Sequence, residues 1–90
     1  MNKKRIKLYA NKLKAMGNER RLEILFYLYE QEHNVGELEQ KINLSQSALS
    51  QHLAVLRGAE IVKTRRVAQT IYYSLKDKDV SRLLAQIEDF

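Results

Sequence analysis

The sequence contains no cysteine, no proline and only three glycines. Without cysteine, disulfides, thiolate metal sites and thiol redox sensing by this chain are excluded. The lack of proline and the scarcity of glycine favour a compact, mainly helical structure without long linkers. No apolar run approaches the roughly 20 residues that a membrane-spanning helix needs, and the basic N-terminal segment lacks the apolar run of a signal peptide. These absences predict a soluble cytoplasmic protein with no membrane partner.

The 90 residues suffice for one small domain, 1–90, with a single core. Positive charge is unevenly distributed along this domain. The net charge of +5 divides into +7 over residues 1–21, −4 over 22–45, +4 over 46–76 and −2 over 77–90. This segregation favours a polyanionic partner, and no segment combines the strong basic amphipathicity and aromatic anchors that a membrane surface requires. A domain of this size is marginal as a monomer, which favours a dimer.

Residues 34–57 predict a helix-turn-helix, two short helices joined by a polar corner. In both helices, apolar residues recur at offsets of three and four, the spacing of one buried face: Val35, Leu38 and Ile42, then Leu49, Leu53 and Leu56. Asn34 and Glu37 predict a capping box at the first helix. Ser45 is expected to cap the second helix, named here the reading helix.

The outward face of the reading helix is made of small, uncharged side chains. At about 100° per residue, Ser47, Ser50, Gln51 and Ala54 point away from the leucines, with Gln46 at the leading edge. Glutamine can pair with adenine, serine with several bases, and an alanine methyl can contact the thymine methyl. The alternative is an ordinary polar surface, since serine and glutamine are common there, and this face alone does not decide between the two.

The remaining chain predicts three more helices and a β-hairpin. Residues 2–16 form a helix that Gly17 ends, and a core helix runs from Asn18 to about Gln31. Gly58 is expected to stop the reading helix. Alternating β-branched and aromatic residues predict a hairpin over residues 61–75 with its tip near 67–69, and a last helix covers residues 78–90.

A basic hairpin directly after a helix-turn-helix has the form of a wing. Arg65 and Arg66 lie next to its tip, on opposite sides of the strand, so we expect only one to reach DNA directly; the alternative is a solvated, protective strand edge. The predicted fold class is mainly α with a β-hairpin, a winged helix-turn-helix in the order α-α-α-α-β-β-α. Candidate DNA contacts are Gln46, Ser47, Ser50, Gln51, His52, Arg57, Arg65, Arg66, Gln69 and Thr70.

The two histidines are each interpreted as non-catalytic. His52 lies toward the core side of the reading helix, which indicates packing or a phosphate contact rather than metal binding. His33 is interpreted as a solvated loop residue. Tyr72 and Tyr73 are expected to pack within the hairpin. With two isolated histidines and no thiol, the chain offers no convincing catalytic set, so no enzyme activity is expected.

Three segments resemble the ArsR/SmtB family of bacterial winged-helix transcription regulators, and most of all its HlyU-like branch. They are LKAMGNERRLEILFYL (13–28), VGELEQKINLSQSALSQHLAVLRGAEIV (35–62) and RRVAQTIYYSL (65–75). The resemblance implies a nucleoid-associated DNA-binding homodimer on imperfect inverted repeats. It also implies repression, or activation by displacing a silencing protein from AT-rich DNA. The implied dimer contact uses the first and last helices: Ile6, Tyr9, Leu13, Val80, Leu83, Leu84, Ile87 and Phe90; the alternative is packing within one subunit.

The sensing chemistry of the family does not carry over to this sequence. Where metalloid sensors of the family have a Cys-x-Cys pair, this chain has residues 33–36, His-Asn-Val-Gly. The last helix offers carboxylates but no histidine, and carboxylates alone hold zinc weakly. Phe26 occupies the position at which the HlyU-like branch would carry a cysteine. We therefore expect no transition metal and no cofactor.

Two functional hypotheses remain. The first is a sequence-specific double-stranded DNA-binding regulator. The second is a winged-helix protein–protein interaction module that does not read DNA. A salt-dependent mobility shift on a specific DNA, compared with scrambled DNA, separates them.

Overall fold

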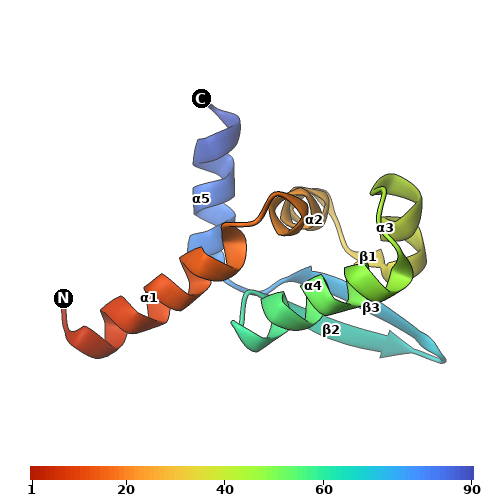
Figure 1. The fold of residues 1–90 in the computed structure, drawn as a ribbon, viewed down its shortest axis with the longest axis horizontal. Helices are drawn as coiled ribbons and strands as arrows, with labels where there is room; N and C mark the ends of the chain where they lie inside the picture. Colours follow the sequence, from red (N-terminus) through yellow and green to blue (C-terminus); the bar gives the residue numbers. More distant parts are fainter.

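The computed structural model describes all of residues 1–90 and has the expected winged-helix order with one additional strand. Five helices and three strands follow in the order α1 (Lys3–Met16), α2 (Glu19–Glu30), β1 (His33–Asn34), α3 (Val35–Lys41), α4 (Gln46–Gly58), β2 (Val62–Val67), β3 (Thr70–Leu75) and α5 (Lys78–Glu88). The fold is mainly helical with an antiparallel β-hairpin, as predicted (Figure 1). No helix is long and apolar enough to cross a membrane.

The helix-turn-helix is formed by α3 and α4, and both predicted caps are present. The Asn34 side chain accepts from the Glu37 backbone amide at 2.8 Å, and the Glu37 carboxylate accepts from the Asn34 amide at 2.8 Å. The Ser45 hydroxyl accepts from the Ala48 amide at 3.1 Å. Each cap satisfies amide groups that a helix start leaves unpaired, so local sequence alone sets where these helices begin.

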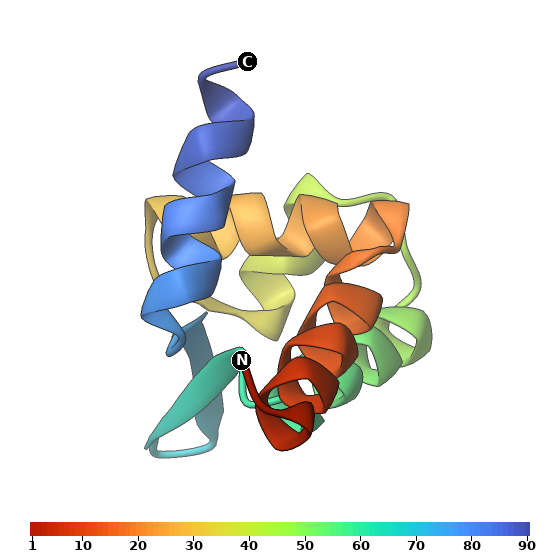
Figure 2. The same cartoon turned by 90° about the vertical axis from the view of Figure 1, so that its left-hand side faces the viewer.

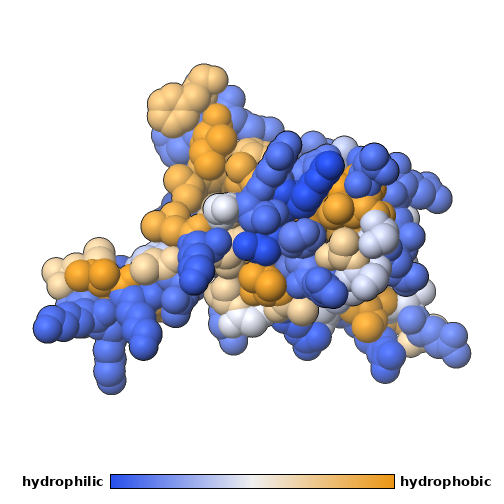
Figure 3. All heavy atoms as spheres, in the orientation of Figure 1, coloured by the Kyte–Doolittle hydropathy of each residue, from blue (hydrophilic) through white to orange (hydrophobic).

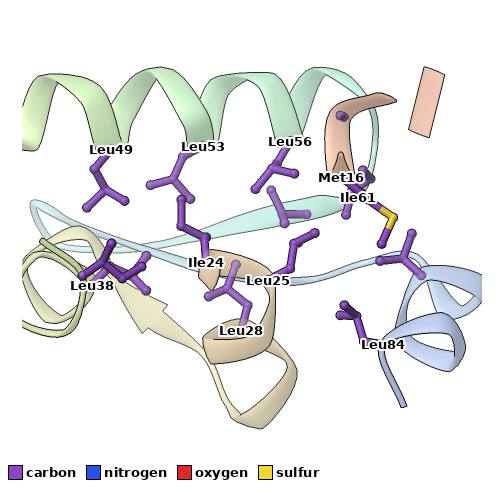
Figure 4. Close-up of a cluster of buried hydrophobic side chains, with 14 residues drawn as sticks. Met16, Ile24, Leu25, Leu28, Leu38, Leu49, Leu53, Leu56, Ile61 and Leu84 are labelled. Carbon is purple, nitrogen blue, oxygen red and sulfur yellow. The ribbon is translucent and has the colours of Figure 1, made fainter. Parts of the chain in front are cut away.

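The core lies between α4 and the helices α2 and α3. Leu49, Leu53 and Leu56 project from α4 toward Leu38 and the apolar side of α2, and all are fully buried (Figure 4). Each such side chain contributes about 1.5–3 kcal/mol when removed from water. This packing fixes the rotation of α4 about its axis, so its opposite face must point to solvent.

The sheet has the strand order β1-β3-β2, and all pairs are antiparallel. β2 and β3 pair from Val62 with Leu75 at the base to Val67 with Thr70 at the tip, so the turn is Ala68-Gln69. This agrees with the expected tip. Ala68 adopts φ 55°, a left-handed conformation that usually favours glycine or asparagine, which explains why the sequence carried no turn signal. The two-residue β1 was not predicted because it is too short to show alternation.

The expectation that His33 is solvated is wrong. His33 is 1% exposed and lies in β1, paired with Tyr73 of β3. Its Nδ1 lies 2.8 Å from the Gln31 carbonyl oxygen, to which it donates, and its Nε2 accepts from the Lys41 ammonium at 2.7 Å. A buried polar ring is stable only when its nitrogen atoms are hydrogen-bonded, and here both are. His33 therefore connects the end of α2 to the end of α3.

Helices α1 and α5 project from the rest of the molecule and meet at one corner (Figures 1 and 2). Lys12 and Asp77 form an ion pair at this corner, with both side chains mostly buried. The Tyr9 hydroxyl donates to the Asp79 carboxylate at 2.6 Å. Asp77 also caps α5 by accepting from the backbone amides of Asp79 and Val80. These contacts fix the angle between the two helices.

The ionisation of Asp77 makes the free energy of unfolding depend on pH. Burial alone would raise the pKa of Asp77, but hydrogen bonds from Lys12 and from the α5 backbone amides outweigh it and hold the pKa below its usual value. A carboxylate whose pKa is lower in the folded state stabilises the fold at pH values above its unfolded-state pKa. This stabilisation is lost as the pH falls through the folded-state pKa.

We expect Asp77→Asn, which keeps a capping oxygen, to lower the free energy of unfolding by about 1 kcal/mol at pH 7. Urea unfolding of wild type and variant at pH 7 and at pH 3 gives this difference, which should be smaller at pH 3. The same difference at both pH values would mean that ionised Asp77 does not stabilise the fold.

Helix α4 ends at Gly58, as expected, but the left-handed residue that usually follows a helix end is not this glycine. Gly58 is the last helical residue, and the left-handed residue is Glu60, with φ 63°. The Ile61 amide donates to the Leu56 carbonyl at 3.0 Å and the Glu60 amide to the Arg57 carbonyl at 3.0 Å. This is the Schellman pattern, in which glycine is favoured at the position that Glu60 occupies.

Replacing Glu60 by glycine is therefore expected to stabilise the protein. Glu60→Gly and Glu60→Ala both remove the exposed ion pair with Lys76, but only glycine relieves the left-handed strain. We expect Glu60→Gly to exceed Glu60→Ala in free energy of unfolding by about 1 kcal/mol. Paired denaturant titrations give the difference, and equal stabilities would mean that Glu60 carries no strain.

Candidate nucleic-acid interface

The outward face of α4 is open to solvent, as the periodicity predicted. Ser47, Ser50, Gln51 and Ala54 are all exposed, and Gln46 is exposed at the first turn. No side chain on this face takes part in an ion pair or a side-chain hydrogen bond. The face therefore presents free amide, hydroxyl and methyl groups on a rigidly backed helix, which is the arrangement that direct base recognition needs.

The start of α4 meets the wing at an open hollow of about 380 Å³. Gln46 lines it from α4, Gln69 and Thr70 line it from the wing, and the first residues of α3 close it. The structure thus brings together three of the residues that the sequence nominated for DNA contact. A second hollow of about 310 Å³ places Arg57, at the other end of α4, beside Lys63 of β2.

The two wing arginines lie on opposite faces of the sheet, and only one is engaged within the protein. Arg65 donates to both carboxylate oxygens of Glu32, at 3.1 and 2.7 Å, and its guanidinium lies 4.9 Å from the Tyr72 ring centre. The hydrogen bond from Arg65 holds the pKa of Glu32 below its usual value. Arg65 is therefore held against the outer face of the sheet, away from the core.

Arg66 faces the other way. It pairs with Ile71, and strand alternation places both on the face that carries buried Val62. Tyr73 and Leu75 lie on the same face and pack against the core that α4 covers, so this face of the wing is the one turned toward α4. Arg66 is exposed and has no ion pair. Of the two arginines, Arg66 is the one free on the side of the reading helix.

His52 lies half-buried between α4 and α2. Arg21 Nη1 lies 3.3 Å from His52 Nδ1, and Arg21 Nε donates to the Ala15 carbonyl at 2.6 Å. Burial and then the charge of Arg21 lower the pKa of His52 from its usual value, which favours the neutral ring. The packing interpretation of His52 accords with these contacts, and its Nε2 has no protein partner.

The residues nominated for a dimer contact fall into two sets. Val80 and Leu84 are 4% and 0% exposed and lie in the core of this chain, because α5 packs on α2 through them. They offer no surface to a partner, which corrects their nomination. Tyr9 is half-buried, while five apolar side chains remain exposed: Ile6, Leu13, Leu83, Ile87 and Phe90. Figure 3 shows this apolar surface along α5 and the adjoining side of α1.

Two residues that shape this interface were missed in the sequence. Glu32 neutralises Arg65 from 33 positions away, and Arg21 fixes His52 from 31 positions away. A signal for Glu32 was absent because the strand that brings it to the wing, β1, is two residues long. Arg21 stands next to Arg20 in the sequence, and nothing there distinguished it from its neighbour.

A helix-turn-helix followed by a two-stranded wing defines the winged helix-turn-helix class of DNA-binding proteins. Residues 18–64 match the family model described as bacterial regulatory protein, arsR family. The chain belongs to the ArsR family of bacterial transcriptional regulators, as the sequence resemblance suggested, and is therefore a DNA-binding transcription regulator.

Its relatives include both activators and repressors. The chain is 54% identical over 72 residues to the transcriptional activator HlyU of Vibrio cholerae, which covers 80% of this chain and 67% of that protein. It is 43% identical over 81 residues to the biofilm growth-associated repressor of Xylella fastidiosa, with 90% and 71% covered. Among solved structures, HlyU from Vibrio cholerae superposes with a TM-score of 0.92 at 45% identity, covering 98% of this chain and 96% of that one. The HlyU-like likeness is thus confirmed.

Proposed function

We propose that this protein is a homodimer that recognises an inverted-repeat sequence in double-stranded DNA and regulates transcription from it. The outward face of α4 enters the major groove of each half-site, with the wing on the neighbouring backbone. The observation that carries this proposal is the free, uncharged face of α4, held by three fully buried leucines. Such a face supplies base contacts, while nearby cations supply affinity that is independent of sequence.

The homodimer is supported by the exposed apolar surface on α1 and α5. Ile6 and Leu13 are more than half exposed, and Leu83 and Ile87 lie on the adjoining side of α5. Two copies related by a twofold axis would bury these side chains against each other. Two reading helices would then meet successive major grooves about 34–36 Å apart. A sedimentation experiment should give twice the mass of one chain.

Control of this regulator is proposed to involve neither thiols nor a transition metal. The chain has no cysteine, which rules out a thiol sensor within it. Its carboxylates are poor zinc ligands without nitrogen or sulfur partners. As a transcription regulator it is proposed to act in the bacterial cytoplasm, on the nucleoid.

A binding titration tests the proposed function. Fluorescence anisotropy compares a labelled duplex from the promoter region next to the gene with a scrambled duplex of equal composition, at several salt concentrations. Tighter binding to the specific duplex, with log affinity falling linearly against log salt, supports the proposal. Equal, weak binding to both duplexes would instead favour the protein–protein interaction module.

The two wing arginines are expected to behave differently in the same assay. Arg66→Ala should weaken binding to all sequences and flatten the salt slope by roughly 0.9 for each phosphate that is no longer neutralised. Arg65→Ala should flatten it less, because Glu32 already neutralises that guanidinium. The reverse order would show that the outer face of the wing, not the face toward α4, meets the DNA.

A further inference from the structure

The side of α4 opposite the wing carries a second basic surface. A hollow of about 320 Å³ lies there between α1 and the C-terminal half of α4. Asn11 and Lys14 line it from α1, Arg21 from α2, and Val55 and Gly58 from α4. From the sequence, the N-terminal lysines could either contact flanking phosphates or only solubilise the first helix; the structure adds that the C-terminal end of α1 lies beside the C-terminal half of α4. In Figure 1 the C-terminal end of α1 lies near the C-terminal end of α4, and the N-terminal half of α1 extends away from the rest of the molecule.

The basic residues of α1 are sorted by face. At 100° per residue, Lys3, Lys7 and Lys14 fall within about 40° of one another, next to Asn11 and away from the stripe of Ile6 and Leu13. Figure 3 shows the same division, with hydrophilic residues below α1 and apolar residues above it. The apolar stripe thus stays available for a second copy while the basic face points elsewhere.

These cations are not neutralised within the protein. Lys3, Lys7 and Lys14 are exposed and have no ion pair, whereas Lys12, on another side of α1, is paired with Asp77. No acidic residue lies in α1. Arg21 is held in the hollow by the Ala15 carbonyl and His52, and its Nη2 has no protein partner. A row of unpaired cations is complementary to a phosphate backbone.

We propose that Lys3, Lys7, Asn11, Lys14 and Arg21, named here the α1 phosphate face, bind the DNA backbone flanking each half-site, on the side of α4 opposite the wing. This rests on the proposed function. Lys3 and Lys14 are eleven residues apart, or about 17 Å along the helix. That length matches roughly five base pairs of duplex. The reading helix is thereby held from both sides, by the wing and by α1.

The experiment compares two charge-matched double variants. Lys7→Gln with Lys14→Gln removes two cations from the α1 phosphate face, and Lys78→Gln with Arg82→Gln removes two exposed cations from α5. A preferred site is first selected from a random pool of duplexes with the wild-type protein. Binding of the wild type and of both variants is then measured on two duplexes that contain this site. One duplex is trimmed to the central site, and the other extends by roughly one helical turn of flanking DNA on each side.

Wild type should bind the extended duplex more tightly and with a steeper salt slope than the trimmed one. The α1 variant should lose most of this gain, with the slope on the extended duplex reduced by roughly 0.9 for each phosphate that α1 no longer neutralises, whereas the α5 variant should keep it. An unchanged slope in the α1 variant, or an equal reduction in the α5 variant, would overturn the inference. Wild-type protein that selects no site would overturn the proposed function itself, and this inference with it.

Discussion

Replacing Gln51 by alanine is expected to weaken binding to the preferred DNA site by about 1–3 kcal/mol, or roughly 5- to 150-fold, and to relax the base preference at one position per half-site. Gln51 is exposed near the centre of the outward face of α4, opposite Leu49, Leu53 and Leu56. Its amide offers a donor and an acceptor side by side, which matches the major-groove edge of adenine. No protein group competes for it.

The measurement is anisotropy on the preferred duplex, on single-base variants and on random DNA. Binding to random DNA should change by less than about twofold, because Gln51 carries no charge and phosphate contacts dominate there. Gln86→Ala, which removes an exposed amide from α5, is the matched control and should bind as wild type. Equal losses on preferred and random DNA would remove Gln51 from base recognition.

Replacing His33 by alanine is expected to lower the free energy of unfolding by about 2–3 kcal/mol. The substitution removes a ring that is 1% exposed, together with its hydrogen bonds to the Gln31 carbonyl and the Lys41 ammonium. It also removes the edge-on contact with the Tyr27 ring, whose centre lies 5.9 Å away. The expected cost combines the cavity with the loss of both hydrogen bonds.

His52→Ala supplies the comparison, because it removes the same side chain from a position that is only partly buried. Its expected cost is about 1 kcal/mol or less, since only one hydrogen bond at 3.3 Å is removed. Urea denaturation of both variants at pH 7 gives the two values. A His33→Ala variant as stable as His52→Ala would mean that the ring does not join α2 to α3.

Local patterns predicted the reading helix well, because every signal for it lies within about twenty residues. The leucine spacing, the capping box of Asn34 and Glu37 and the Ser45 cap all concern neighbours in sequence. They set the start of α4 and its rotation, which together determine which residues face outward. The fold class followed from the order of such local elements.

Contacts between distant residues could not be predicted in this way. His33 was interpreted as solvated because nothing near it in sequence shows that Tyr73 pairs with it across 40 positions. The neutralisation of Arg65 by Glu32 and the burial of Val80 and Leu84 depend equally on how separate elements meet. The strain at Glu60 was not predicted because glycine, the usual signal, stands two residues earlier.

The role of α4 as the DNA-reading element is tested most directly by mapping which DNA positions lie next to it. Since the chain has no cysteine, one introduced thiol carries a DNA-cleaving iron chelate at a single position. Labelled Ala54→Cys, on the outward face of α4, should cut the bound site in two clusters about one helical turn apart. Labelled Glu30→Cys, exposed at the end of α2, should not cut. If Ala54→Cys gives no localised cleavage on bound DNA, or Glu30→Cys cuts equally, α4 is not the element that reads the DNA.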